Sequence, residues 1–201
     1  MKVPFVDLGL QYIDLRSKII KKFDQISKKG QYILGDELSL FEKEFAKFVG
    51  VKYSVGVGNG SDAISFSLLA LGIGKGDEVI IPTNSFVATA WTVANIGAIP
   101  VFCDVLDDFN INPAEIRKKI NKKTKAIIPV HLTGRMANIK DILQIAKENK
   151  IHVIEDAAQA IGASYNKKKA GSFGIVGCFS LHPLKNLHVH GDGGVITTNK
   201  K

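Results

Sequence analysis

The middle of the chain alternates short apolar runs with amphipathic segments of helical length. The apolar runs cover residues 78–82, 99–105, 125–130 and 152–155, and consist mostly of Val, Ile, Ala, Phe and Pro. Strands this apolar are usually buried on both faces, as in a parallel sheet between two layers of helices. The alternation therefore predicts an α/β fold, a three-layer α/β/α arrangement with a mostly parallel sheet.

The two ends of the chain have other patterns. Before residue 50, apolar residues recur at helical spacing in two groups, separated by a glycine-bounded link at 30–35. Residues 53–57 are predicted to form a strand that runs into a glycine-rich turn and a helix. After residue 156 the pieces become short, with a hairpin turn at 165–169 and strands at 177–181 and 194–198.

The composition is that of an ordinary globular protein, with 45% apolar and 23% charged residues in a chain of 201. No apolar run approaches the ~20 residues that span a membrane. The first residues, Met1 to Asp7, lack the apolar core of a secretory signal, so we expect a cytoplasmic protein. Cys103 and Cys178 lie in apolar runs and are predicted to be buried free thiols. A metal site would need more ligands at closer spacing, and none is expected.

The formal net charge of +8 comes from 27 Lys and Arg against 19 Asp and Glu. The lysines are scattered along the chain, as expected for solvated helix faces and a loop tip at 167–169. Such a charge attracts anionic small molecules such as a sugar nucleotide. A nucleic-acid-binding protein, which would concentrate the charge on one face, is the alternative that charge alone leaves open. We expect neither nucleic acid nor a membrane as partner.

One lysine, Lys185, lies in a segment that otherwise contains apolar residues, glycines and single polar groups. An amine among apolar neighbours loses its proton more readily and can form a Schiff base with a carbonyl compound. The alternative is an ordinary surface lysine whose stem lies along apolar surface. The functional interpretation, an anchor for pyridoxal phosphate (PLP), depends on what other segments supply.

Several upstream residues have the chemistry that a PLP site needs. The turn Gly58-Asn59-Gly60-Ser61-Asp62 offers backbone N–H groups and a helix dipole to a phosphate, although a plain tight turn is the alternative. Asp156 ends an apolar strand, where its carboxylate would pair with a protonated pyridine nitrogen, with a lysine or with a helix end. Phe86 either stacks on a ring or packs in the core. His131 binds either a cofactor or substrate, or a backbone group.

Together these segments resemble the DegT/DnrJ/EryC1/StrS family of PLP-dependent sugar aminotransferases, in the fold-type I aspartate aminotransferase superfamily. The resemblance covers essentially the whole chain. It rests on Val3-Pro4-Phe5-Val6-Asp7-Leu8, Ile33-Leu34-Gly35, Asn59-Gly60-Ser61-Asp62-Ala63, Phe86-Val87-Ala88-Thr89, Pro129-Val130-His131-Leu132, Glu155-Asp156-Ala157-Ala158-Gln159-Ala160, Gly177-Cys178-Phe179-Ser180, Lys185-Asn186-Leu187 and Gly191-Asp192-Gly193-Gly194. It implies that residues 1–201 form the large PLP-binding domain with an N-terminal helical segment, and that the family's C-terminal small domain is absent from this chain.

Residue by residue, the resemblance implies a complete cofactor site. Lys185 matches the lysine that forms the internal aldimine and acts as general acid and base, and sugar dehydratases related to the family carry histidine there. Asp156 matches the acid at the pyridine nitrogen, Gln159 a polar group near the phenolic oxygen, and Phe86 the aromatic that stacks on the ring. The implied phosphate cradle comprises Gly60, Ser61 and Ser180.

The implied reaction moves an amino group from an amino acid, with glutamate as the expected donor, to a nucleotide-linked keto-sugar. Such reactions serve polysaccharide, lipopolysaccharide or amino-sugar biosynthesis, and a homodimer with shared active sites is expected. A truncated, non-catalytic PLP-binding or regulatory module of the same fold is the alternative. Two positions depart from the family, which often has Tyr where this chain has Thr133 and Asp where it has Ile175.

Overall fold

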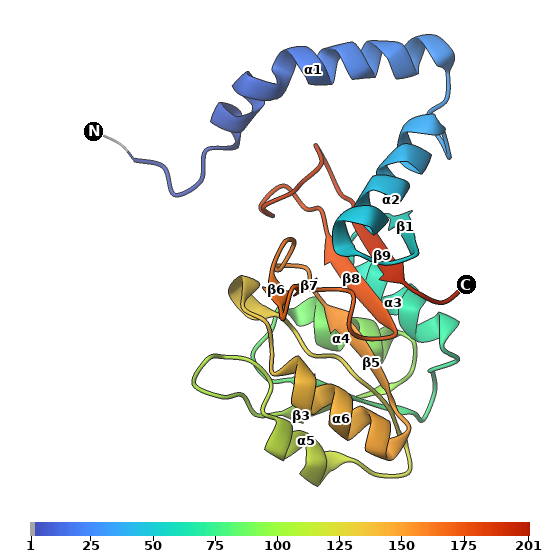
Figure 1. Cartoon of the computed structure of the whole chain (residues 1–201), viewed down its shortest axis with the longest axis vertical. Helices are drawn as coiled ribbons and strands as arrows, with labels where there is room; N and C mark the ends of the chain where they lie inside the picture. The colour runs from blue at the N-terminus through green and yellow to red at the C-terminus, as the bar shows by residue number, and fades with distance from the viewer. Residues whose placement is uncertain (1–2) are drawn as a thin grey trace. The chain divides into compact units, whose positions relative to one another are not determined.

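The computed structural model describes residues 3–201, and the chain divides into two compact units, Met1–Phe41 and Glu42–Lys201 (Figure 1). The first unit contains helix α1 (Leu8–Lys29) and the start of α2 (Asp36–Val49). Asp7 caps α1 by accepting a hydrogen bond from the Leu10 N–H at 3.0 Å, and Gly30 ends it in the left-handed conformation. The two helices predicted before residue 50 are confirmed.

The second unit is built on a seven-stranded sheet. Its strands, in spatial order, are β1 (Tyr53–Val57), β9 (Gly194–Thr198), β8 (Val176–Ser180), β5 (His152–Asp156), β4 (Thr124–Ile127), β2 (Glu78–Pro82) and β3 (Ile99–Cys103). Neighbours from β8 to β3 pair in parallel, whereas β9 runs antiparallel to both β8 and β1. The sheet is therefore mostly parallel, as predicted.

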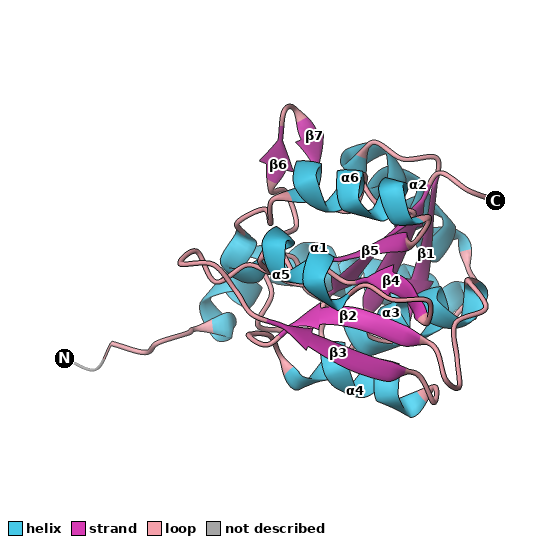
Figure 2. Ribbon diagram, turned by 90° about the horizontal axis from the view of Figure 1, so that it is seen from below, coloured by secondary structure: helices cyan, strands magenta, loops and turns pink. Residues whose placement is uncertain are grey.

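Helices cover both faces of this sheet (Figure 2). One apolar core joins it to α3 (Gly60–Ala70) and α4 (Val87–Asn95), and a second joins it to α5 (Pro113–Lys119) and α6 (Ile139–Asn149). Successive strand residues alternate between the cores: in β2, Val79 and Ile81 belong to the first and Ile80 to the second. Burial on both faces explains the continuous apolar runs, and the predicted three-layer fold is confirmed.

The boundaries of the predicted elements differ from the observed ones by a few residues. The run 125–130 was expected to be one strand, but β4 ends at Ile127 and only an isolated bridge between Val130 and Asp156 follows. Pro129 has no N–H to donate to a ladder, which accounts for the early end. The hairpin predicted at 165–169 is present as β6 (Ser164–Tyr165) and β7 (Lys168–Lys169).

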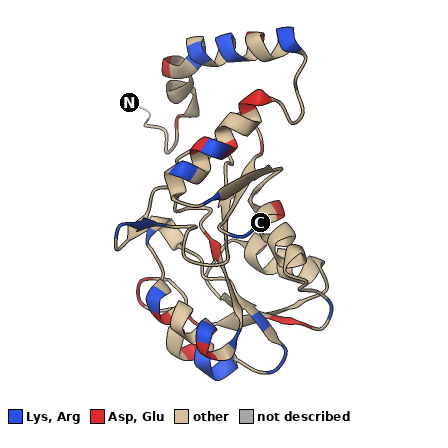
Figure 3. Cartoon of the chain, turned by 45° about the vertical axis from the view of Figure 1, so that its right-hand side comes forward, with Lys and Arg blue, Asp and Glu red and all other residues tan. Residues whose placement is uncertain are grey.

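Charged residues of the second unit are spread over helices, strands and loops (Figure 3). Several basic side chains pair with acids on the surface, such as Arg117 with Glu148 at 2.7 Å and Lys118 with Glu115 at 2.6 Å. Within residues 3–201, no helix is both long and apolar enough to cross a membrane.

Candidate active site

A cavity of about 380 Å³ lies at the edge of the sheet where β5 and β8 end. Its volume is within the usual range for small-molecule sites. The antiparallel β9 begins at the same edge, because Gly194 pairs with both Ser180 of β8 and Val57 of β1. All seven residues predicted to contact a cofactor line this cavity: Gly60, Ser61, Phe86, Asp156, Gln159, Ser180 and Lys185.

Asp156 supplies a buried carboxylate, with only 5% of its surface exposed. Its Oδ2 accepts a hydrogen bond from the Thr89 hydroxyl at 2.9 Å, and its Oδ1 accepts one from the Ala158 N–H at 3.2 Å. Burial raises the pKa of this carboxyl above its ordinary value, although both hydrogen bonds and the Lys185 charge oppose the rise. A cation beside Asp156 would stabilise the ionised carboxylate and lower its pKa again.

The N-terminus of α3 forms a second wall of the cavity. Asn59 caps the helix, since its side chain accepts the Asp62 N–H at 2.8 Å. In the described part of the chain, the N–H groups of Gly60 and Ser61 have no acceptor, so they remain available for an anion.

Two close approaches hold this helix end beside the sheet. A Cβ on Gly60 would lie 2.9 Å from the Cβ of Ser180, and a Cβ on Gly194 would collide with the Asn59 carbonyl. Glycine at both positions therefore lets the first turn of α3 contact the ends of β8 and β9 directly.

Lys185 is half-buried at the end of a short turn that follows β8. The Ser180 hydroxyl accepts the His182 N–H at 3.3 Å, and the His182 ring accepts the Leu184 N–H at 3.2 Å. The Lys185 N–H in turn donates to the His182 carbonyl at 2.8 Å. Among the residues that the structure describes, the Lys185 amine has no hydrogen-bond or ion-pair partner. The turn thus places at the cavity an amine that is free to bind a ligand.

Phe86 and Gln159 complete the lining of the cavity. Phe86 precedes α4 and its surface is 72% exposed, so it does not pack in the core, which was the alternative to stacking on a ligand. The Gln159 Oε1 accepts the Thr133 N–H at 3.1 Å. Because the amide oxygen is used in this way, the amide NH₂ is left to donate.

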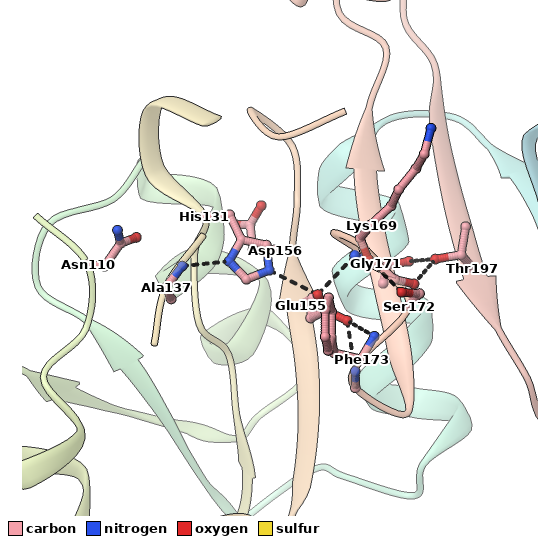
Figure 4. A network of polar contacts seen from close by, with 12 residues as sticks. Asn110, His131, Ala137, Glu155, Asp156, Lys169, Gly171, Ser172, Phe173 and Thr197 are labelled. Carbon is pink, nitrogen blue, oxygen red and sulfur yellow. Dashed lines mark hydrogen bonds and ion pairs between the residues drawn. The ribbon is translucent and has the colours of Figure 1, made fainter. Parts of the chain in front are cut away.

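His131 binds a buried carboxylate rather than lining the cavity (Figure 4). Its Nδ1 accepts the Ala137 N–H at 3.1 Å, so Nε2 carries the proton and donates to Glu155 Oε2 at 2.9 Å. Of the open alternatives for His131, the structure supports a backbone contact, together with a side-chain partner that was not foreseen.

Glu155 is fully buried and accepts four hydrogen bonds (Figure 4). Besides His131, its donors are the backbone N–H groups of Gly171, Phe173 and Gly174, at 2.9, 2.7 and 2.8 Å. Glu155 and Asp156 are consecutive in β5, so their side chains point to opposite faces of the sheet. Glu155 therefore holds the loop 171–174, which precedes β8, by hydrogen bonds on the face of the sheet opposite to Asp156.

The two cysteines are buried free thiols, as predicted. Burial raises the pKa of Cys103 to about 11 and that of Cys178 further, so both stay protonated at neutral pH. Among residues 3–201, no three His, Cys, Asp or Glu side chains gather as metal ligands would.

No role was predicted from the sequence for Thr89, Asn59 or His182, which hold Asp156, α3 and the Lys185 turn. Asn59 had a usable signal, because Asn directly before a helix with Asp three residues later is a typical N-cap. Thr89 and His182 had none, since their partners become neighbours only in the folded chain.

A family model described as the DegT/DnrJ/EryC1/StrS aminotransferase family matches residues 13–201. The chain belongs to this family. The resemblance found in the sequence is confirmed at family level, while the roles of individual residues stay predictions.

The relatives of this chain include a protein named as a regulator and proteins named as enzymes. The chain is 48% identical, over 99% of its length, to a "Pleiotropic regulatory protein" of Geobacillus stearothermophilus. It is 46% identical, over 98% of its length, to a UDP-N-acetyl-3-dehydro-alpha-D-glucosamine 3-aminotransferase of Acidithiobacillus ferrooxidans. The crystal structure of NtdA from Bacillus subtilis, with bound cofactor PMP, superposes with a TM-score of 0.94 at 36% identity over 100% of this chain.

The chain spans about half the length of these proteins: 54% and 53% of the two relatives and 46% of the NtdA chain. What the longer proteins do is therefore a basis for proposals about this chain.

Proposed function

We propose that this chain is the PLP-binding part of a nucleotide-sugar aminotransferase. The observation that carries the proposal is one cavity that combines the uncommitted amine of Lys185, the buried carboxylate of Asp156 and the spare N–H groups at the start of α3. These groups match the aldehyde, the pyridine nitrogen and the phosphate of PLP in charge and hydrogen-bonding capacity. When bound, PLP supplies a carbonyl that takes up an amino group and a ring that delocalises negative charge.

Each residue then has a definite task. The Lys185 amine would hold the cofactor and would serve as the acid and base that moves a proton during the reaction. Asp156 would pair with the ring nitrogen, and Phe86 would contact the ring. Gln159 could donate a hydrogen bond from its NH₂ to the phenolic oxygen. Gly60, Ser61 and Ser180 would hold the phosphate.

The substrates and the assembly follow from the relatives. The name of the Acidithiobacillus relative supports a keto-sugar linked to a nucleotide as amino acceptor, and glutamate is the proposed amino donor. We also propose a homodimer in which a partner subunit completes each site, in agreement with the exposed position of Phe86 at the cavity. A cytoplasmic location is part of the same proposal.

A non-catalytic module that holds PLP is the second candidate. It is favoured by the name of the Geobacillus relative, a regulatory protein 48% identical to this chain.

The donor half-reaction separates the two candidates. Glutamate added to the PLP-loaded chain should abolish the visible band of the cofactor and release 2-oxoglutarate. Positioned proton transfer contributes ~10²–10⁴ in rate, so Lys185→Ala should slow the release at least by that factor. A PLP-loaded chain whose spectrum is unchanged by glutamate and by other amino acids would favour the non-catalytic module.

A further inference from the structure

The turn that carries Lys185 is held largely by His182, the residue that begins it. Of residues 182–185 only three have a backbone N–H, because Pro183 lacks one. The Leu184 N–H donates to the Nδ1 of the His182 ring at 3.2 Å, and the Lys185 N–H donates to the His182 carbonyl at 2.8 Å. His182 therefore supplies the acceptors for both N–H groups that follow it in the turn.

The ring of His182 can accept the Leu184 N–H only while it is uncharged. A neutral imidazole accepts at one nitrogen and donates from the other, whereas a protonated ring donates from both. Because Nδ1 is the acceptor, the ring proton lies on Nε2. His182 is exposed, so a second proton can reach it from solvent. That proton on Nδ1 would point at the Leu184 N–H, and the hydrogen bond would be lost.

His182 also connects the turn to the proposed phosphate site. Its N–H donates to the Ser180 hydroxyl oxygen at 3.3 Å, so the hydroxyl hydrogen stays available to an anion. Ser180, His182 and Lys185 all line the same cavity. A shift of His182 would therefore disturb the phosphate contact and the position of the lysine together.

Few other charged groups line the cavity that His182 faces. The lining residues from α3 and α4 are uncharged, and β5 contributes the carboxyl of Asp156. Lys185 and Asp192 lie on the same segment of the chain as His182. All three groups remain in place in any variant at position 182, so a comparison between such variants isolates the effect of the His182 ring.

We propose that His182 is a positioning residue for Lys185, and that its uncharged ring keeps the turn in the conformation that reacts with the cofactor. The inference rests on the proposed function, because it concerns how readily the Lys185 amine joins the aldehyde of PLP with release of water. Histidine ordinarily changes its charge between about pH 8 and pH 5, so the turn loosens over this range.

Two substitutions separate the acceptor of His182 from its ring. His182→Asn keeps an acceptor, because an asparagine oxygen commonly accepts the N–H two residues further on, and it takes up no proton. His182→Phe keeps a ring that has no acceptor. His152→Asn is the matched control, since His152 begins β5 at the opposite edge of the sheet and does not line the cavity.

The rate of PLP attachment is followed by absorbance between pH 8 and pH 5.5. At pH 8, His182→Phe should react about three- to tenfold more slowly than the parent chain, the effect of one lost hydrogen bond, and His182→Asn should match the parent. As the pH falls, the parent and His152→Asn should both slow by about three- to tenfold relative to His182→Asn. A charged ring that acted only by repelling the lysine charge would favour the uncharged amine and have the opposite effect.

Amide hydrogen exchange of the cofactor-free chain gives a second readout that needs no PLP. The Leu184 N–H should be protected at pH 8 in the parent and in His182→Asn. At pH 5.5, after correction for the intrinsic exchange rate, only His182→Asn should keep this protection.

The two readouts distinguish failure of the inference from failure of the proposed function. Equal pH profiles of attachment for the parent and His182→Asn, or equal protection of Leu184 at pH 5.5, would overturn the inference while PLP uptake leaves the proposed function standing. If the parent takes up no PLP, the proposed function fails, and the exchange of Leu184 still decides whether the uncharged His182 ring holds the turn.

Discussion

The buried carboxyl of Asp156 makes the stability of the cofactor-free chain depend on pH. Its pKa is raised by burial, so the folded chain keeps this proton to higher pH than the unfolded chain, for which the ordinary value is 3.8. The stability that the protonated carboxyl contributes is complete below that value and is lost as the pH rises through the folded pKa. The cofactor-free site is thus less stable at neutral pH than a neutral side chain would make it.

Asp156→Asn should therefore stabilise the cofactor-free chain at pH 8. The amide oxygen can accept the Ala158 N–H, and the amide NH₂ can donate to Thr89, whose hydroxyl can turn to Ser85 at 2.8 Å. We expect about 1 kcal/mol, or roughly 2–4 °C in melting temperature, with the gain vanishing as the pH falls toward the ordinary carboxyl value.

The same variant should bind PLP at least tenfold more weakly, because the ring nitrogen loses its negative partner. Melting curves between pH 3.5 and 8 and a PLP titration check both effects. Asp141→Asn, an exposed carboxyl outside the cavity, serves as control. A destabilised Asp156→Asn chain at pH 8 with normal PLP affinity would refute this view of Asp156.

Substitution of Gly194 tests whether the start of α3 binds an anion. Gly194→Ala places a Cβ against the Asn59 carbonyl and 3.0 Å from the Gly60 nitrogen, so β9 or the helix end has to move. Overpacking of this kind costs about 1–3 kcal/mol. We expect a lower melting temperature and loss of the stabilisation that added inorganic phosphate gives the parent.

Gly74→Ala is the matched control for Gly194→Ala. A Cβ on Gly74 would make only an ordinary contact, 3.8 Å from the Ile96 carbonyl oxygen. Equal stabilisation by phosphate in the parent, the control and Gly194→Ala would exclude this helix end as the anion site.

At the scale of elements, Glu155 joins the end of β5 to two loops. Three backbone N–H groups and His131 face its carboxylate, and a glutamine cannot satisfy all four donors. Glu155→Gln should therefore destabilise the chain by about 1–3 kcal/mol for each donor left without an acceptor, seen as a fall of about 2–12 °C in melting temperature.

Glu148→Gln makes the same chemical change on the surface, where Glu148 pairs with Arg117. It should change stability by less than about 1 kcal/mol. Similar melting temperatures for the two variants would mean that the Glu155 contacts do not hold these loops.

Most elements could be predicted from the sequence, because strands such as β2 are buried on both faces and carry an unbroken apolar run. Their spatial order could not, since β9 pairs with β1 through residues 137 to 145 positions apart in the chain. The cofactor residues were found by resemblance to the family. The Glu155–His131 pair could not be predicted from the sequence, because it forms where segments far apart in the chain meet.

At the scale of the whole molecule, the chain contains the sheet edge that lines the cavity but only about half the length of its relatives. The cavity at that edge needs no residue outside the second unit for its lysine, its carboxylate and its helix end. Cofactor binding should therefore survive in this chain even if turnover requires further protein.

The most direct test of the account is where PLP attaches. The purified chain is loaded with PLP, reduced with borohydride and digested, and its peptides are analysed by mass. We expect a visible absorption band before reduction and one reduced cofactor on the peptide with Lys185, absent from Lys185→Ala. A colourless chain, or label spread over surface lysines, would contradict it.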